Sequence, residues 1–516
     1  MRRDWYIWSA LVTIFLACST QTPMKDTWPH GVKYEIFVLA FADGNGDGKG
    51  DLKGLTEKLD YVQNLGVNGI WLMPIMPSPS YHKYDVTDYK EIHPDYGTLD
   101  DFKLFVTEAH SRGIHVVVDL ILNHTSKQHP WFLEASSGKD SPYRDYYVWA
   151  DRDSIADEIS KKTITLDSDN ITQWHAVNGD VEAEHYYGFF SGHMPDLNFD
   201  NPKVRNECVD IAKFWLEEMK VDGFRFDAAK HIYPDDRAVD NHEFWKWYKE
   251  ELKNIKPDVY LIGEVYSLIA EEVVPYTIGL PSLFNFEMGD AITNAIVEGK
   301  DTVGLIDKYI KQAELFRSVN PDFLDSPILS NHDQNRIASE LGNNINKIKV
   351  AASILLTLPG APYIYYGEEL GMLGMKPDEF IREPFLWGQD SYTTSWTVPR
   401  FSTETTVQSL ALQELDQQSV YHHYKKWIAY RNSSKILTYG NIMAVSGIPN
   451  EVIGLKRSFE NQSALVLHNI SDVEVTITLN DELKEFDAID FSTNASNRLE
   501  DATLTLAAYS TVVLEM

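Results

Sequence analysis

Three acidic residues that follow apolar runs carry the clearest chemical signal in this sequence. Asp227 and Glu264 each end such a run, and Asp333 follows a third after a short polar stretch. An ionised carboxylate is costly to bury without partners, so these placements predict that the three side chains share one polar pocket. A carboxylate and a protonated carboxylic acid roughly 5 Å apart can hydrolyse a glycosidic bond with retention of configuration.

The residues around these carboxylates favour one assignment of roles. Arg225 lies two residues before Asp227 on the same strand face and would keep it ionised, so Asp227 is the predicted nucleophile. Glu264 is then the acid/base, and Asp333 would hold sugar hydroxyls and stabilise the oxocarbenium-like transition state. A lone strand-end Asp is often only a helix cap. A fourth apolar run is also followed by polar residues, Asn123 and His124, and four such strand ends in order argue against coincidence. Two histidines could donate hydrogen bonds to sugar hydroxyls: His124 and His332.

Strand-like apolar runs alternate with amphipathic helical stretches along most of the chain, which predicts a (β/α)₈ barrel of the α/β class. Active sites of such barrels lie at the carboxyl ends of the strands, where the polar residues above stand. The clearest helices are Leu99–Ser111, Pro202–Lys220 and His242–Ile255. The expected strands are Tyr34–Leu39, Gly69–Met73, His115–Leu120, Gly223–Asp227, Tyr260–Glu264, Leu283–Phe286, Ile328–Asn331 and Tyr363–Tyr366.

Two regions depart from the barrel pattern. Residues 125–192, between the third and fourth strands, are rich in aromatics and Asp and predict an inserted domain over the barrel mouth. The barrel would then comprise residues 28–124 and 193–432. Residues 433–516 contain short alternating runs and predict an all-β sandwich. Its expected strands are Ile442–Val445, Val452–Lys456, Ala464–His468, Val473–Leu479 and Thr503–Leu514.

The N-terminus has the pattern of a targeting signal. Residues 5–17 are almost wholly apolar, which is too short to span a bilayer comfortably but fits the core of a signal peptide. The run ends in Leu-Ala-Cys-Ser, which resembles a bacterial lipobox in which Cys18 is lipidated. We therefore expect a signal at 1–18, a polar tether at 19–27 and a cell-envelope lipoprotein. A plain secretory signal, giving a periplasmic or extracellular protein, is the alternative.

Seven segments together resemble the α-amylase family, glycoside hydrolase family 13. Four segments of this chain resemble the family's four main motifs and stand in the same order: DLILNH, GFRFDAAKH, GEVY and SNHD. Three more segments resemble further motifs of the family: MPDLN at 194–198, GIWLMP at 69–74 and APYIYYGEE at 361–369. The resemblance implies the barrel, an inserted domain B, a β-sandwich domain C and a retaining mechanism. By motif position it gives Asp227, Glu264 and Asp333 the roles derived above.

The resemblance also implies substrate contacts. YHKY at 81–84 is similar to the family's YHGY, whose second tyrosine stacks on the sugar beside the cleavage point, with Lys83 in place of the glycine. Exo-acting α-glucosidases usually have Asp where this chain has Tyr81, which favours endo action. Lys230 and His231 resemble the pair on the leaving-group side. Asp378 and Arg382 either grip the non-reducing sugar or form an ordinary i,i+4 ion pair. The implied set also includes His82 and Tyr84.

The loop at residues 43–51 predicts a calcium site. Oxygen side chains alternate with glycines, so that several oxygens can converge on one hard cation. The loop resembles the calcium loop after strand one in many family members, and a metal-free acidic loop is the alternative. The resemblance also allows a second calcium near Asn123 that uses the carbonyl of His231. The predicted ligands of the first Ca²⁺ are Asp43, Asn45, Asp47 and Asp51 with their side chains and Lys49 with its carbonyl.

Composition restricts the partners. The chain has 46 Lys and Arg against 77 Asp and Glu, a formal charge of −31. Such a surface repels phosphate backbones, so we expect no nucleic acid partner, and membrane contact only through the lipid anchor. Cys18 and Cys208, the only two cysteines, indicate neither a disulfide framework nor a thiolate metal site. Oligomeric state stays open.

Two rival functions remain at this stage. A maltooligosaccharide- or cyclodextrin-preferring hydrolase, or a transglycosylase of the same family, differs in how the acceptor side excludes water, which the sequence does not resolve. A non-catalytic glucan-binding envelope protein is the alternative from another class. Relatives that have lost catalysis lack the three carboxylates, which this chain retains at 227, 264 and 333. The expected function is therefore endo-type hydrolysis of starch, glycogen or maltooligosaccharides.

Overall fold

A sheet of eight parallel strands forms the centre of the computed structural model, which describes residues 27–156, 173–179, 184–388 and 391–516. The strand order is β10-β9-β8-β7-β3-β2-β1-β11. The ends of this order are joined where the backbone N–H of Ala361 donates to the carbonyl of Asp325 at 2.8 Å, which closes the barrel. The strands are β1 (Lys33–Ile36), β2 (Gly69–Leu72), β3 (His115–Leu120), β7 (Gly223–Phe226), β8 (Tyr260–Gly263), β9 (Ser282–Asn285), β10 (Leu324–Pro327) and β11 (Tyr363–Tyr365).

The strands are short and buried along nearly their whole length, as expected when helices cover a parallel sheet. Large side chains fill the interior of the barrel, including Trp71, Ile262, Phe284 and Tyr363. A turn at Gly360 makes the closure possible. Its φ of 93° lies in the left-handed region, and a Cβ there would stand 2.2 Å from the carbonyl oxygen of Asp325.

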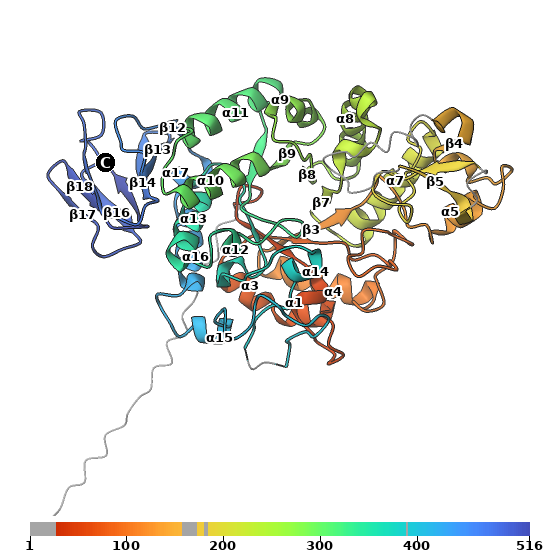
Figure 1. Cartoon of the computed structure of the whole chain (residues 1–516), viewed down its shortest axis with the longest axis horizontal. Helices are drawn as coiled ribbons and strands as arrows, with labels where there is room; N and C mark the ends of the chain where they lie inside the picture. The colour runs from red at the N-terminus through yellow and green to blue at the C-terminus, as the bar shows by residue number, and fades with distance from the viewer. Residues whose placement is uncertain (1–26, 157–172, 180–183, 389–390) are drawn as a thin grey trace, which may run out of the picture.

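Helices surround the barrel (Figure 1). α4 (Leu99–Ser111) begins with a capping box between Thr98 and Asp101 and buries an apolar face that includes Phe102 and Phe105. α7 (Pro202–Lys213) starts with proline in its first turn and continues as a π-helical turn at Phe214–Glu218. The other helices are α1 (Val38–Phe41), α2 (Leu52–Glu57), α3 (Leu59–Leu65), α5 (Pro130–Ala135), α8 (Ala238–Ile255), α9 (Ala270–Val273), α10 (Phe286–Glu298), α11 (Leu305–Val319), α12 (Ile337–Glu340), α13 (Ile345–Thr357), α14 (Asp378–Ile381), α15 (Leu410–Gln413), α16 (Val420–Ser433) and α17 (Lys435–Tyr439).

The segment between β3 and β7 forms a small domain of its own. Its antiparallel sheet has the order β4-β6-β5 and lies at one end of the molecule, opposite the C-terminal sheets (Figure 1). An isolated bridge between His124 and Asp196 ties the two ends of the insertion together beside the barrel. The strands are β4 (Trp149–Ala150), β5 (Trp174–Ala176) and β6 (His185–Tyr187).

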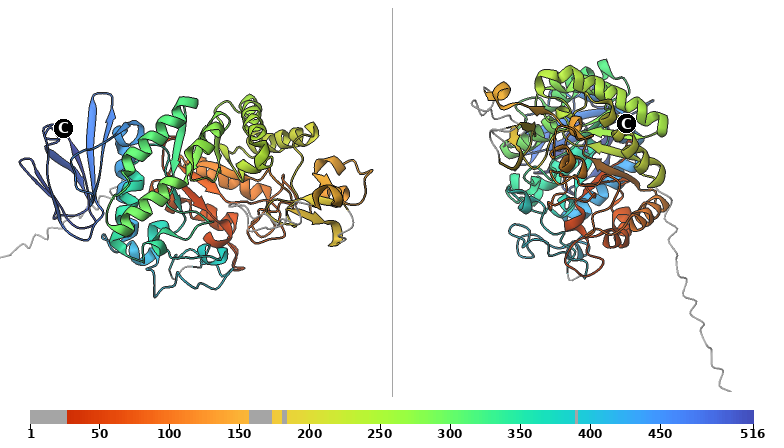
Figure 2. Two further views of the ribbon diagram at one scale, coloured as in Figure 1. Left: turned by 45° about the horizontal axis from the view of Figure 1, so that its top comes forward. Right: turned by 90° about the vertical axis from the view of Figure 1, so that its right-hand side faces the viewer.

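The C-terminal region is an all-β sandwich (Figure 2). One sheet has the order β12-β13-β14-β19-β16, and the other has the order β15-β18-β17. Leu467 and Leu514 from the first sheet share an apolar core with Ile477 and Leu504 from the second. The strands are β12 (Asn441–Ala444), β13 (Val452–Phe459), β14 (Gln462–Asn469), β15 (Val475–Thr478), β16 (Ala488–Ser492), β17 (Arg498–Glu500), β18 (Thr503–Leu506) and β19 (Thr511–Glu515).

These elements confirm the predicted fold class: a (β/α)₈ barrel with an insertion after the third strand and a C-terminal all-β sandwich. The strand predicted at Ile328–Asn331 is wrong, because the seventh barrel strand is Leu324–Pro327. That strand carries Asp325, whose carboxylate accepts hydrogen bonds from the Asn285 amide on β9, and a buried polar strand of this kind lacks an apolar run.

Other predicted boundaries also change. The first strand ends at Ile36 instead of Leu39, because Val38 begins α1. The run predicted as one strand over Thr503–Leu514 is two strands, β18 and β19, separated by a turn in which Tyr509 has a φ of 47°.

Across the described residues, we find no helix with both the length and the apolar character needed to cross a membrane. The predicted signal, Cys18 and nearly all of the predicted tether fall within residues 1–26, outside the described residues. Cys208 is buried on α7 and makes no disulfide.

Candidate active site

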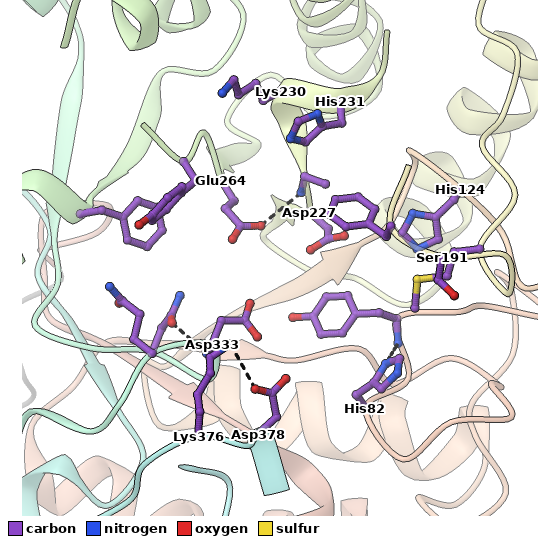
Figure 3. Close-up of a pocket in the computed structure, with 18 of the residues that line it drawn as sticks. His82, His124, Ser191, Asp227, Lys230, His231, Glu264, Asp333, Lys376 and Asp378 are labelled. Atoms are coloured by element: carbon purple, nitrogen blue, oxygen red, sulfur yellow. Dashed lines mark hydrogen bonds and ion pairs between the residues drawn. The ribbon is translucent and has the colours of Figure 1, made fainter. Parts of the chain in front are cut away.

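A cavity of about 510 Å³ opens at the carboxyl ends of the barrel strands. Asp227, Glu264 and Asp333 face it from three sides (Figure 3). The barrel supplies most of the wall, and the inserted domain supplies Phe190 and Ser191, with Met194 just beyond its predicted end. The remaining lining residues are His82, Tyr84, His124, Ala228, Lys230, His231, Tyr266, Phe286, Asn331, Gln334, Lys376, Asp378 and Arg382.

The backbone after β7 and β8 positions two of the carboxylates. Asp227 directly follows β7, and Glu264 directly follows β8. Ala228 has a φ of 46°, in the left-handed region that alanine rarely adopts. This turn directs the Ala228 N–H toward the Glu264 carboxylate, which accepts it at 3.2 Å. The local strain thus lies between the two groups whose separation matters for the chemistry.

Arg225 bridges the carboxylates from below the cavity. Its Nη1 lies 2.7 Å from Asp227 Oδ1 and 2.9 Å from both carboxylate oxygens of Asp119, and its Nη2 lies 2.7 Å from Glu264 Oε2. The guanidinium is fully buried, so these bonds exchange little with water. Arg225 therefore contacts both predicted catalytic groups, whereas the sequence predicted only the contact with Asp227.

Burial and mutual repulsion raise the pKa values of these acids. Burial raises the pKa of Asp227 to about 6; Arg225 opposes this shift, and Asp119 and Asp333 add to it. Burial also raises the pKa of Asp119 to about 6, against the effect of Arg225. The pKa of Glu264 is raised by burial and by the charges of Asp227 and Asp333, again against Arg225. The raised pKa of Glu264 favours the protonated form that a general acid needs, and Asp227, with a pKa of about 6, is largely ionised near neutral pH.

Asp333 has a different environment. Burial would raise its pKa, but His332 and the arginines Arg382 and Arg225 outweigh that effect and hold the pKa below its usual range. Arg382 Nη2 lies 2.8 Å from Asp333 Oδ1 and 3.0 Å from Asp378 Oδ2. The predicted pair of Asp378 and Arg382 is therefore an ion pair that also lines the cavity. Asp333 is held as an anion.

The YHKY segment lies on the cavity wall. The Tyr84 ring stacks on the His332 ring with centroids 5.5 Å apart, and its hydroxyl donates to Asp119 at 3.1 Å. His82 accepts the Tyr84 N–H at 3.1 Å. Lys83 has a φ of 68°, in the left-handed region, which explains why the resembling motif has glycine there. The Lys83 ammonium donates to the Ser80 carbonyl, away from the cavity lining.

The inserted domain and the turn after β7 close the other side. Burial lowers the pKa of His124 to about 4, so its imidazole is neutral, and its buried Nε2 has no partner among the described residues. His231 stacks on Phe189 from the inserted domain with centroids 4.0 Å apart. Lys230 lines the same cavity. His124, Lys230 and His231 therefore all border the space that a sugar would occupy.

The predicted substrate residues thus gather at one site, but two of them lie beneath the cavity and do not line it. Arg225 and His332 are fully buried beneath the cavity floor, and the others form its wall. Sequence reasoning gave no role to Asp119, although it stands in the DLILNH segment, nor to Glu35 on β1. The sequence also did not predict that Phe190 and Tyr266 line the cavity, because loop residues follow no hydrophobic periodicity that would indicate their position.

The predicted calcium loop lies outside this cavity. Asp43 accepts backbone N–H groups from Gly46 at 2.6 Å and Gly48 at 2.7 Å, and Asp51 caps α2 by accepting from Gly54. Gly46 and Gly48 have φ values of 84° and 88°. In the described ranges, no three His, Cys, Asp or Glu side chains are grouped so that they could hold a metal ion. The donors that the loop offers are all oxygens, which fits a hard cation.

Comparison with known proteins identifies the family. The model of the α-amylase catalytic domain matches residues 35–440, and that of the C-terminal domain of α-amylase SusG matches residues 452–513. The chain is 43% identical to α-amylase 3 of Dictyoglomus thermophilum over 100% of both chains. It is 36% identical to a 4-α-glucanotransferase of Thermotoga neapolitana, covering 86% of this chain and 96% of that one.

A solved structure agrees with these matches. The crystal structure of an α-amylase from H. orenii superposes with a TM-score of 0.85 at 42% identity, covering 94% of this chain and 99% of the other. The similarity includes both the barrel and the C-terminal sheets. One family model covers the barrel, and the other covers most of the C-terminal region. The chain belongs to the α-amylase family of glycoside hydrolases.

Proposed function

We propose that the protein cleaves internal α-1,4-glucosidic bonds of starch, glycogen or maltooligosaccharides and retains the anomeric configuration. The observation that carries this proposal is the convergence of Asp227, Glu264 and Asp333 on one cavity, with the first two bridged by Arg225. A retaining mechanism needs one ionised and one protonated carboxyl close together. The raised pKa of Glu264 and the contact of Asp227 with Arg225 favour such a pair.

The first step forms a covalent intermediate. An Asp227 oxygen attacks the anomeric carbon as the bond from that carbon to the leaving oxygen breaks, and the proton on Glu264 passes to the leaving oxygen. The positive charge that develops on the sugar ring faces Asp333, which is held as an anion by His332 and Arg382. Arg225 keeps Asp227 and Glu264 in place through both nitrogens of one planar group.

The second step reverses the proton transfer. Once Asp227 is esterified its negative charge is gone, so the repulsion that raised the pKa of Glu264 is reduced. Glu264 then takes a proton from water as the water oxygen bonds to the anomeric carbon and the ester to Asp227 breaks. Both carboxyl groups return to their starting states.

Endo action rests on the residue at position 81. Tyr81 stacks on Trp396 with centroids 5.4 Å apart, and the Arg382 guanidinium carbon lies 5.8 Å from its ring. The resemblance places an Asp here in exo-acting α-glucosidases, which would bind the terminal sugar of a chain. Because this chain has no Asp at that position, we expect the glucan chain to extend past the cleaved residue.

Calcium binding at residues 43–51 is part of the proposal. Asp43, Asn45, Asp47 and Asp51 would supply side-chain oxygens, and Lys49 its carbonyl. A bound Ca²⁺ would supply structural stability to the loop between α1 and α2. A second ion near Asn123 would require the Asn123 amide to turn its oxygen toward the ion, because its NH₂ group donates to the His231 carbonyl and the Asp196 carboxylate in this structure.

Transglycosylation is the second candidate, favoured by the 36% identity to a 4-α-glucanotransferase. A cyclodextrin- or maltooligosaccharide-preferring hydrolase belongs to the same alternative. A non-catalytic glucan-binding role would require that the three carboxylates do no chemistry, and Glu264→Gln with unchanged glucan hydrolysis would support it.

Product analysis separates the candidates. With soluble starch, maltoheptaose, cyclodextrin and pullulan as substrates, the proposal predicts short α-anomeric oligosaccharides from starch and a fall in starch viscosity that precedes the rise in reducing ends. Products longer than the starting maltoheptaose, formed in excess over reducing ends, would instead establish the glucanotransferase. Release of only glucose or maltose from chain ends would contradict endo action.

We also propose a location. Lipidation of Cys18 after signal cleavage would anchor the protein to the bacterial cell envelope, with the acidic catalytic body held off the membrane by the polar tether at 19–27. The support is the sequence pattern alone. An enzyme placed there would meet glucans too large to cross the envelope.

A further inference from the structure

Glu35 is a buried carboxylate that the mechanism above does not use. It lies on β1 at 1% exposure, and its Oε1 is 2.5 Å from Nδ1 of His332, which follows β10. His332 has its other ring nitrogen, Nε2, 2.6 Å from the Tyr84 hydroxyl and 3.1 Å from Asp333 Oδ2. A line of contacts therefore runs from the barrel wall through one imidazole to a residue of the active site.

The neighbours of Nε2 favour a proton on that ring nitrogen. The Tyr84 hydroxyl donates its hydrogen to the Asp119 carboxylate, so it offers His332 only an acceptor. Asp333 Oδ2 is an acceptor as well. A bare lone pair on Nε2 would face two acceptors, so Nε2 carries a hydrogen. Nδ1 faces Glu35, and a proton also lies between these two atoms.

The surroundings of the ring favour placing that second proton on the imidazole. Burial would lower the pKa of His332, but Asp333 and Glu35 outweigh it and raise the pKa to about 10. Burial raises the pKa of Glu35, and His332 and Arg225 oppose this shift. The charged and titratable groups that act on this pair from the packed elements are Asp119, Arg225, Glu264, Asp333, Arg382, Tyr84, Tyr363 and Tyr365.

We propose that Glu35 is a positioning residue that keeps His332 as a doubly protonated imidazolium, so that His332 holds Asp333 ionised and aimed at the reacting sugar. The charge, rather than the hydrogen bond alone, is the contribution of Glu35. Asp333 is 43% exposed on its side chain, so without the cation beneath it water and Arg382 would be its main partners. For its kinetic readout this inference rests on the proposed function.

The variant Glu35→Gln separates charge from position. An amide of the same shape can still hold the ring by one hydrogen bond, but it provides no negative charge. We expect the ratio of kcat/KM between variant and wild type to be near one at about pH 5. Above about pH 6.5, the ordinary value for histidine, the ratio should fall by up to about tenfold per pH unit as the ring loses its proton.

Glu369→Gln is a matched control. Glu369 is also a fully buried carboxylate, and it accepts hydrogen bonds from Tyr34 and Tyr61 away from the cavity lining. Its variant should show a ratio that does not change with pH. A ratio for Glu35→Gln that is equally independent of pH would mean a purely structural role and overturn the proposal.

A second readout does not depend on catalysis. With ¹⁵N-labelled histidine and His332→Gln used for assignment, NMR of the full-length wild type should show both His332 ring nitrogens protonated up to about pH 8. In Glu35→Gln the ring should titrate to the neutral form below that pH. A neutral His332 in the wild type at pH 8 would refute the proposal even if Glu35→Gln fails to fold. An inactive enzyme with a protonated His332 would refute the proposed function instead.

Discussion

Replacing Arg225 with methionine removes the only cation that contacts Asp119, Asp227 and Glu264 together in the described structure. The side chain is fully buried, so no water takes the place of the guanidinium without rearrangement. Breaking a buried ion pair on one side typically costs about 3–5 kcal/mol. We expect a loss of at least that size in the free energy of unfolding near neutral pH.

The pH dependence of this loss is a sharper test than its size. Asp119 and Asp227 have folded pKa values of about 6 in the presence of Arg225, which lowers both, so removal of Arg225 raises them further. Carboxyls with raised folded pKa values favour folding at low pH and lose that contribution as pH rises. While the folded variant keeps these two protons and the wild type does not, the stability of the variant should fall more steeply than that of the wild type, by about 2.7 kcal/mol per pH unit.

Urea unfolding at about pH 7 and about pH 8 measures this slope. In the wild type both acids are largely ionised above pH 7, so its stability should change much less over the same interval. Arg431→Met is the control, because Arg431 is equally buried but contacts the carbonyls of Leu356, Leu358 and Gly360. Its loss should not vary with pH. Parallel slopes for Arg225→Met and the wild type would refute this electrostatic account.

Three further predictions concern catalysis, metal and location. Asp227→Asn removes the ionised nucleophile, so kcat should fall by many orders of magnitude with the Tm little changed, and more than a tenth of wild-type activity would exclude the assignment. Chelation should lower the Tm of the wild type. The loss corresponds to about 2.7 kcal/mol of stability if calcium was present at a hundredfold excess over Kd, and Asp47→Ala should abolish this sensitivity. Melting curves that coincide with and without chelator would argue against the site. Cys18→Ser should move the protein from the membrane fraction to the soluble fraction, and a wild type found wholly in the soluble fraction would contradict lipidation.

Much of the barrel could be predicted because its strands are local apolar runs. The strands that end before Asp227 and Glu264 were found within one residue, and α4 was found at its observed bounds. β10 could not be found in this way. Its polar residue Asp325 is buried only because Asn285 from another strand donates to it, and such a partner is invisible in a local window.

The candidate site shows the same division. Strand-end carboxylates can be found from the sequence, since a polar residue after an apolar run is a local pattern. The contact between Glu35 and His332 joins positions 297 residues apart, and no spacing rule connects them. The tight turn at Ala228 is equally hidden, because alanine gives no sign of a positive φ.

The proposed mechanism requires that Asp227 form a covalent bond to the sugar. A maltosyl fluoride that carries a second fluorine on the reacting ring slows breakdown of the intermediate more than its formation, so the glycosyl-enzyme accumulates. Peptide mass spectrometry of the trapped protein should then find the sugar on the peptide that contains Asp227 and on its side-chain carboxylate. A label on Glu264 or Asp333, or no label together with β-anomeric first products from starch, would exclude Asp227 as the nucleophile.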